Sequence, residues 1–359
     1  MIGTVPIATL LPGMQVYKYK LQKRIGFGSF GEVWLASDNA VAHDYAIKIL
    51  KPGIPVHERL REAHIGHSLI HNNLVRVHQA DVVALSGHDF VIIAMDYMPD
   101  GAITKLANPS GFLPLPEVIR VGTDILRGLE YLHGQNFFHN DVKPENVLIG
   151  PQKQGMLTDY GIVGISLDGS PVLPPNSYKI HAAPEVFNNA GINAQTDIFQ
   201  TGMTLFRMLV GLSSLRDKFS KLGEQQYYEA SRVAKLVTTS DFPAFVPPRL
   251  RRIVLKAISP GVADRYVSAL EMRRDLEKLN YSGYWTIEAS GSLVGHSQTH
   301  EFRFEHHKRL GNKYEVLAFK KNKTTQRETR LSKFCVSNLT TAQSGKHIEK
   351  FVKSVVGGI

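Results

Sequence analysis

Short segments of alternating apolar and polar residues fill the N-terminal part of the chain. Residues 17–25, 32–37 and 45–50 alternate in this way between turns, which predicts β-strands, and the apolar run 90–97 predicts a buried strand. Residues 56–70 have the spacing of a helix. This part of the chain is therefore expected to form a small unit rich in strands.

From residue 116 onward the apolar positions follow a helical period. One apolar face is formed by Val118, Val121, Ile125, Leu126, Leu129 and Leu132. The same period predicts further helices over residues 197–212, 225–236, 248–258 and 267–279. A strand-rich small lobe followed by a helical large lobe is the expected α+β architecture.

The pattern returns to alternation near the C-terminus. Strands are predicted over residues 284–288, 301–306, 313–320 and 329–336, and a helix over residues 347–356. We expect domains at residues 1–281 (small lobe about 15–96, large lobe about 99–280) and 282–359. The second domain is a small strand-rich α+β module whose role the sequence does not reveal.

Charge is unevenly distributed along these domains. The chain of 359 residues has a net charge of +10. From Tyr281 to the end there are 13 Lys and Arg against 6 Asp and Glu, so most of the excess belongs to the C-terminal module. Its basic clusters at 306–309 and 320–323 predict either solvent-exposed hairpin ends or an anionic partner, such as nucleic acid, a lipid surface or an acidic protein.

Cysteine content and hydropathy bear on the location. Cys335 is the single cysteine, so no intramolecular disulfide forms and a reducing compartment is expected. No signal peptide is recognisable in residues 1–14, and no run of about 18 apolar residues predicts a transmembrane segment. The expected location is cytoplasmic.

A glycine-rich motif is the first candidate site for a ligand. Gly26, Gly28 and Gly31 are followed by Val33, and glycines at this spacing let backbone amides approach phosphate oxygens. The motif alone also fits a dinucleotide-binding turn or a purely structural one. The strand predicted after it favours a hairpin that covers a nucleotide.

A lysine on a predicted strand and a glutamate on the next predicted helix are candidates for a pair that contacts the ligand. Lys48 alternates with apolar neighbours on a predicted strand, so it points to one face, where it reaches phosphates or simply solvent. Glu62 on the following helix is the preferred partner for Lys48, with Glu58 one turn earlier as its rival.

Three further motifs carry a family resemblance. They are residues 139–146 (HNDVKPEN), 159–161 (DYG) and 183–185 (APE). Together with the glycine motif, Lys48 and Glu62, in this order, they make residues 17–279 resemble the eukaryotic-like (Hanks-type) Ser/Thr protein kinase family. The resemblance implies the bilobal protein-kinase fold.

The resemblance also implies roles for the polar residues. ATP and Mg²⁺ are the expected cofactors, with Lys48 on the α- and β-phosphates, oriented by Glu62. Asn146 and Asp159 would bind the metal. Asp141 would orient the substrate hydroxyl, and Lys143 would neutralise the transferred phosphate, as in members that act on serine and threonine of protein substrates.

Other positions match supporting parts of the family pattern. The residues expected to line the adenine pocket and its connecting segment are Val33, Ala46, Met95, Asp96, Met98 and Leu148, with Met95 as gatekeeper. Asp197 is expected to hold the backbone of the catalytic loop. Glu185 and Arg265 are expected to form a buried ion pair.

Four residues depart from the family pattern. Asn140 replaces an arginine that usually receives an activating phosphate, and Tyr160 replaces a phenylalanine. Tyr178 stands where a threonine is usual, and Gly66 stands where a bulky apolar residue is usual, which leaves a space to be filled in another way. Asn140, Gly66 and Tyr178 keep one alternative to an active protein kinase open, a nucleotide-binding pseudokinase acting as a scaffold or allosteric regulator. A small-molecule kinase of the same fold is a third possibility, but the intact motif at 183–185 and the long segment before it count against that possibility.

Overall fold

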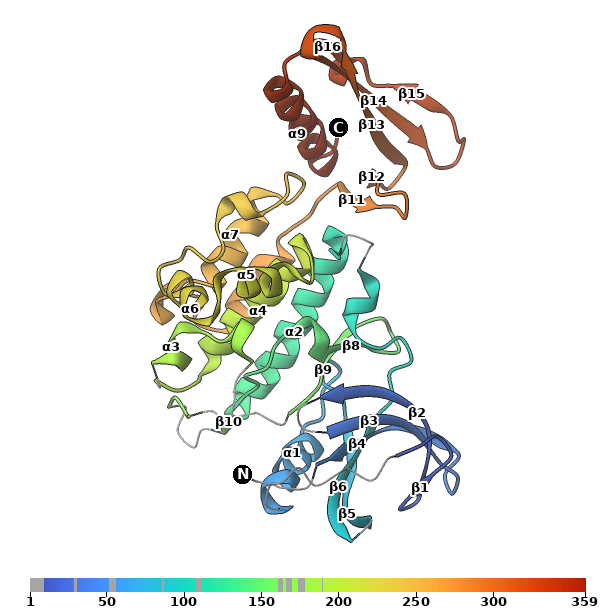
Figure 1. Cartoon of the computed structure of the whole chain (residues 1–359), viewed down its shortest axis with the longest axis vertical. Helices are drawn as coiled ribbons and strands as arrows, with labels where there is room; N and C mark the ends of the chain where they lie inside the picture. Colours follow the sequence, from blue (N-terminus) through green and yellow to red (C-terminus); the bar gives the residue numbers. More distant parts are fainter. Residues whose placement is uncertain are drawn as a thin grey trace.

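The computed structural model describes residues 10–28, 31–51, 56–85, 87–107, 111–160, 164–165, 170–173, 178–188 and 190–359, without the side chains of residues 28, 58, 59, 61, 62, 164 and 165. The described chain is elongated (Figure 1). A sheet formed by the N-terminal strands lies at one end, helices fill the middle, and a second sheet with the C-terminal helix lies at the other end.

The N-terminal sheet has six antiparallel strands in the order β1-β2-β3-β4-β6-β5. They are β1 (Gln15–Val16), β2 (Tyr19–Gly28), β3 (Gly31–Asp38), β4 (His43–Leu50), β5 (Val77–Leu85) and β6 (His88–Asp96), with helix α1 (Val56–Ser68) between β4 and β5. The predicted strands and helix are all present. Strand β5 was missed because its half-exposed sequence VHQADVVAL lacks a clear alternation.

The two faces of this sheet separate two groups of side chains. Trp34, Ile47 and Ile92 pack in an outer apolar cluster. Residues of the opposite parity, such as Ala46 and Met95, join the main core that continues into the large lobe. Because side chains alternate along a strand, Lys48 lies on the same face as Ala46.

Helices α2 (Leu115–Gly134) and α4 (Ala194–Val210) form the centre of the large lobe. The apolar face predicted for α2 is fully buried. Around them lie α3 (Pro184–Phe187), α5 (Ser214–Leu222), α6 (Glu224–Arg232), α7 (Pro248–Ala257) and α8 (Ala269–Glu277). Short antiparallel pairs, β7 (Phe137–Phe138) with β10 (Gly164–Ile165) and β8 (Val147–Ile149) with β9 (Gly155–Leu157), flank the segment that carries the candidate catalytic residues.

The C-terminal module is a six-stranded antiparallel sheet with one helix. Its elements are β11 (Gly283–Ile287), β12 (Leu293–Ser297), β13 (His300–Arg309), β14 (Lys313–Asn322), β15 (Glu328–Arg330), β16 (Val336–Leu339) and α9 (Thr341–Gly357). The single strand predicted over residues 329–336 is wrong, because a 3₁₀ turn at Ser332–Phe334 separates β15 from β16. Helix α9 begins earlier than predicted, because Thr340 and Gln343 cap its N-terminus reciprocally.

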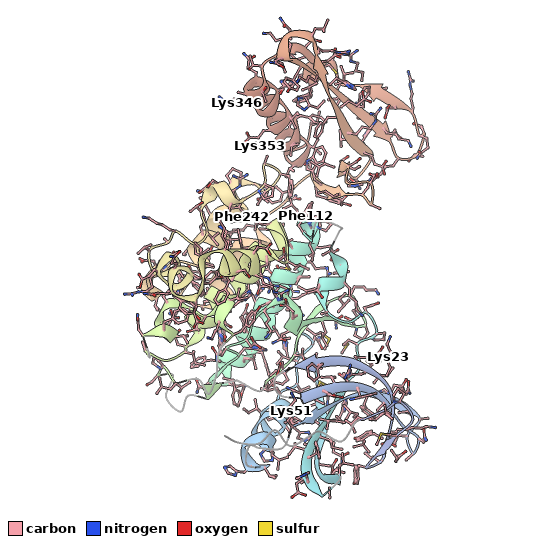
Figure 2. All side chains as sticks on the ribbon, viewed as in Figure 1. Lys23, Lys51, Phe112, Phe242, Lys346 and Lys353 are labelled. Atoms are coloured by element: carbon pink, nitrogen blue, oxygen red, sulfur yellow. The ribbon has the colours of Figure 1, made fainter. Side chains whose placement is uncertain are left out.

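Aromatic side chains hold α9 to the sheet. Trp285 is fully buried, and its indole Nε1–H donates to the backbone oxygen of Val352 at 3.0 Å. The ring of Phe351 packs between Trp285 at 5.9 Å and Phe334 at 5.1 Å. Lys346 and Lys353 lie on the exposed side of α9 (Figure 2). The apolar core of the module is continuous with that of the large lobe.

The two basic clusters of the module lie far from each other. In the β13–β14 hairpin Arg309 pairs with Lys313 at one end, and His300 pairs with Asn322 at the other. The cluster at 306–309 is therefore near the hairpin turn, and the cluster at 320–323 is at the opposite end.

As for membrane insertion, none of the helices in the described part of the chain has the length and apolar composition that a bilayer span requires.

Candidate active site

Side chains of helix α4 hydrogen-bond to the backbone of residues 139–142. Asp197 is fully buried, and its carboxylate accepts hydrogen bonds from the backbone N–H of His139 at 2.8 Å and of Asn140 at 2.7 Å. The role predicted for Asp197 is thereby confirmed. Asn140 has a φ of 61°, in the left-handed region that asparagine tolerates better than most residues. This conformation gives a local reason for asparagine at this position.

Of the two carboxylate oxygens of Asp141, only Oδ2 has hydrogen-bond partners among the described residues. Its Oδ2 accepts from the Lys143 ammonium at 2.6 Å and from the Asn146 amide at 2.7 Å. Its Oδ1 is buried and has no hydrogen-bond partner among the described residues. Burial raises the pKa of Asp141 above its ordinary value, although the nearby Lys143 opposes that shift. The open oxygen is a ready acceptor for a hydroxyl group.

Lys48 and Asp159 meet across the cleft between the lobes. The Lys48 Nζ lies 2.9 Å from Asp159 Oδ1. Burial would raise the pKa of Asp159, but the Lys48 ammonium outweighs it and holds this pKa below its ordinary value. Asp159 is therefore ionised at neutral pH. Glu62 lies on α1, and its side chain, like that of Glu58, is outside the described part of the structure.

Asn146 is oriented by Asp141. Its amide nitrogen also donates to the backbone oxygen of Asp141 at 3.0 Å, so the amide oxygen is the atom that would bind the predicted metal. An amide oxygen and the Asp159 carboxylate fit Mg²⁺, which prefers oxygen ligands and commonly takes one or two from the protein, with water and phosphate oxygens completing its octahedron. The donor set is therefore compatible with the predicted metal.

The glycines of the motif lie at the ends of β2 and β3, where Gly28 pairs with Gly31. Gly26 and Gly28 lie in β2, while Ser29 and Phe30 are outside the described residues. Gly31 has a φ of 156°, and a Cβ there would lie 2.0 Å from the backbone oxygen of Ile49. No larger residue fits at Gly31 without displacing β4.

The residues predicted to line the adenine pocket lie on four segments: β3, β4, the end of β6 with the connecting segment, and β8. Val33 pairs with Lys48 across β3 and β4, and Ala46 pairs with Met95 across β4 and β6. Leu148 of β8 is half-buried and packs against the same core. In the connecting segment Met98 is buried, and the carboxylate of Asp96 contacts His78 Nε2 at 2.6 Å.

Tyr160 fills the space that Gly66 leaves. The tyrosine is 3% exposed, and its hydroxyl donates a bifurcated hydrogen bond to the backbone oxygens of Val75 at 3.0 Å and Leu157 at 3.2 Å. A Cβ at Gly66 would lie 2.4 Å from Val77 Cγ2 and 3.1 Å from Tyr160 Cδ2. The space beside Gly66 is thus filled in another way, as expected, by Val77 and the tyrosine ring.

Tyr178 contacts the catalytic loop through its ring. Lys143 Nζ lies 4.5 Å from the ring centroid, a cation–π contact. The tyrosine thus touches the same lysine that contacts Asp141.

The predicted buried ion pair between Glu185 and Arg265 is confirmed. Arg265 donates to both carboxylate oxygens of Glu185, at 2.7 and 2.8 Å.

Sequence reasoning missed other residues that support the loop. Gln200, Thr204 and Arg207 follow Asp197 on one face of α4 and contact residues 140–145. His181 donates from Nδ1 to the backbone oxygen of Val142 at 2.9 Å. The available signal was a stripe of polar residues at i, i+3, i+7 and i+10 on an otherwise apolar helix.

Comparison with known proteins agrees with this geometry. Residues 19–270 match the protein kinase domain family. Serine/threonine-protein kinase PknB of Mycobacterium leprae is 26% identical over 73% of this chain and 43% of that protein. SNF1-related protein kinase catalytic subunit alpha KIN12 of Arabidopsis thaliana is 30% identical over 60% of this chain and 43% of that protein.

The chain spans less than half the length of these relatives. The family match covers both lobes, and the Mycobacterium leprae relative is named as a serine/threonine-protein kinase. The predicted bilobal fold and the predicted resemblance to serine/threonine protein kinases are thereby confirmed. The chain belongs to the protein kinase family.

Proposed function

We propose that this chain is an ATP- and Mg²⁺-dependent kinase that transfers the γ-phosphoryl group to serine or threonine hydroxyls of protein substrates. The observation that carries the proposal is the carboxylate of Asp141. One oxygen is fixed by Lys143 and Asn146, and the other is buried without a partner among the described residues. A scaffold that only binds nucleotide has no use for such an oriented acceptor.

The acceptor hydroxyl would donate its hydrogen bond to Asp141 Oδ1. Phosphoryl transfer depends mainly on positioning and electrostatics, so a fixed carboxylate contributes by aligning the nucleophile. The Lys143 ammonium, 2.6 Å from Asp141 Oδ2, would lie beside the reacting groups and balance phosphate charge. Lysine at this position supports serine or threonine as the acceptor.

The nucleotide would lie between the lobes. Lys48 would bind its phosphates, with Gly26, Gly28 and Gly31 giving close backbone approach and with Val33, Ala46, Met95, Asp96, Met98 and Leu148 around the adenine. Asn146 and Asp159 would hold Mg²⁺, which supplies charge neutralisation on the phosphate oxygens when bound. Glu62 remains the proposed partner that orients Lys48.

The test compares the wild type with Asp141→Asn and with Asp100→Asn. Asp100 pairs with Lys153 at the surface, so its variant controls for loss of an aspartate outside the cleft. Labelled ATP, Mg²⁺ and a generic protein acceptor should give phosphoserine or phosphothreonine with the wild type and Asp100→Asn. Asp141→Asn should bind ATP with similar affinity and lose transfer by at least about 100-fold.

Two results would count against the proposal. Persistent transfer by Asp141→Asn would remove Asp141 from the mechanism. ATP binding by the wild type with no transfer to any acceptor would favour the pseudokinase alternative.

For the C-terminal module we propose an anionic partner. The support is its excess of basic residues and the clusters at 306–309 and 320–323 at opposite ends of the β13–β14 hairpin. Binding to anionic vesicles, RNA or an acidic protein should weaken steeply as salt rises, and Lys308→Glu and Lys321→Glu would tell which end binds. The cytoplasmic location inferred from the single cysteine stays a prediction.

A further inference from the structure

A polar stripe on α4 faces the catalytic loop. Asp197, Gln200 and Thr204 are all fully buried, and each contacts the backbone of residues 139–142. Asp197 binds the N–H groups before Asp141. Gln200 and Thr204 reach the backbone around Asp141 itself.

Gln200 bridges the two peptide groups on either side of Asp141. Its amide Nε2–H donates to the backbone oxygen of Asn140 at 2.9 Å. Its Oε1 accepts from the backbone N–H of Val142, also at 2.9 Å. A single rigid amide plane therefore sets the distance between the carbonyl that precedes Asp141 and the N–H that follows it.

The conformation of the loop explains why such a bridge is useful. Asn140 has a positive φ, which costs conformational energy in any residue other than glycine and persists where the surroundings fix it. The carbonyl of Val142 is held as well, by Thr204 Oγ1 at 3.0 Å and His181 Nδ1 at 2.9 Å. The backbone is thus fixed on both sides of the aspartate.

Glutamine is well suited to this position, because the bridge needs a donor and an acceptor in one side chain. Glutamate keeps the acceptor for Val142 and lacks the donor for Asn140 when ionised. Methionine fills a similar volume and provides neither strong group, so buried backbone groups lose their hydrogen bonds.

We propose that Gln200 is a positioning residue for phosphoryl transfer: it fixes the orientation of Asp141 through the peptide groups on both sides, without touching the substrate. This inference rests on the proposed kinase function. Loss of the bridge should lower kcat about 10- to 100-fold, since a displacement of about 1 Å at a reacting group has an effect of that size. The KM for ATP should stay within about two-fold, because Lys48 and the glycine hairpin lie elsewhere.

The experiment uses Gln200→Met and Gln200→Glu in the full chain, with Thr201→Val as the matched control. Thr201 is equally buried on the same helix, but its hydroxyl donates to the Asp197 carbonyl within α4 and not to the loop. Steady-state kinetics and hydrogen exchange of the backbone amides of residues 139–146 are measured for each variant. Gln200→Glu also serves if Gln200→Met does not fold.

The expected result has three parts. Both Gln200 variants lose kcat with an unchanged KM for ATP, their loop amides exchange faster, and Thr201→Val behaves like the wild type. Raising the proton concentration should partly restore kcat in Gln200→Glu, because the protonated carboxyl regains a donor. This recovery, measured relative to the wild type at each pH, would assign the loss of kcat to the missing donor.

Three outcomes overturn the inference: unchanged kcat in both Gln200 variants, equal losses in Thr201→Val, or unchanged amide exchange in the loop. If the wild type transfers no phosphate to any acceptor, the proposed function fails, and amide exchange then judges the bridge by itself. The two failures are therefore distinguishable.

Discussion

Replacing Gly66 by alanine should destabilise the protein, although the same change normally stabilises a helix. Gly66 lies in α1, where alanine is favoured over glycine by about 1 kcal/mol. Here a Cβ would lie 2.4 Å from Val77 Cγ2 and 3.1 Å from Tyr160 Cδ2. Neither neighbour moves easily, because valine has a stiff χ1 and the Tyr160 hydroxyl is hydrogen-bonded.

The expected size follows from these opposing effects. Overpacking of a core by one carbon costs about 1–3 kcal/mol, and a contact this short belongs at the upper end of that range. After subtraction of the helix preference, Gly66→Ala should lower the unfolding free energy by about 1–2 kcal/mol. For a domain of about 250 residues this lowers Tm by roughly 2–8 °C. Transfer activity should also fall, because Tyr160 adjoins Asp159.

Thermal unfolding measured beside a matched variant provides the assay. Gly134 is the last residue of α2, and a Cβ there has no neighbour within 4 Å, so Gly134→Ala should leave Tm unchanged or raise it. Adding Val77→Ala to Gly66→Ala should cost less than the sum of the single changes, because the new methyl group then occupies vacated space. If Gly66→Ala raises Tm as Gly134→Ala does, the packing argument is refuted.

Three further predictions concern the large lobe and the C-terminal module. Burial and the neighbouring Arg207 lower the pKa of His181 to about 3, below the 6.5 of an exposed histidine. As the pH falls, the unfolded state therefore binds this proton before the folded state does. The unfolding free energy should then fall by about 1.4 kcal/mol per pH unit below pH 6.5. Urea unfolding at several pH values should show this loss, and His181→Gln should have a shallower slope; equal slopes would contradict the assignment. Arg265→Met should destabilise the large lobe by about 3–5 kcal/mol, because it leaves the Glu185 carboxylate buried without its partner, and the double change with Glu185→Gln should recover part of the lost Tm. Trp285→Ala should lower the unfolding free energy of the C-terminal module by about 3–5 kcal/mol. The kcat should stay near the wild-type value, because the module lies at the end of the molecule opposite the small lobe (Figure 1). A clear loss of kcat would show that the module supports the active site.

The sequence predicted the fold best where local pattern and packing agree. The apolar face of α2 and the alternation in β2 correspond to one buried face, while β4 is buried on both faces and was predicted from its apolar run. In β5 and β16 the pattern was weak, because their half-exposed residues do not separate two faces. The N-terminal cap at Thr340 has a signal in the sequence, a threonine followed three residues later by glutamine. The apolar period alone placed the start of this helix too late, at residue 347.

The site was predictable in its motifs and unpredictable in its supports. Asp141, Asn146, Asp159 and Lys48 come together as their motifs indicated. The sequence indicated that the space beside Gly66 is filled in another way, but not by which residues, because Val77 and Tyr160 lie in other segments of the chain. Long-range contacts of that kind are set by the tertiary structure, and no single segment carries a signal for them.

The hydroxyl of Tyr160 also has a consequence for inhibitor chemistry. Compounds confined to the adenine pocket leave this ring in place. Compounds that extend past Met95, the proposed gatekeeper, by displacing the ring must break its hydrogen bonds to Val75 and Leu157 in a buried site. At about 0.5–1.5 kcal/mol for a net hydrogen bond, such compounds should bind roughly 2- to 13-fold more weakly than to Tyr160→Phe. Selectivity between two classes of drug-like ligand would then depend on one oxygen atom.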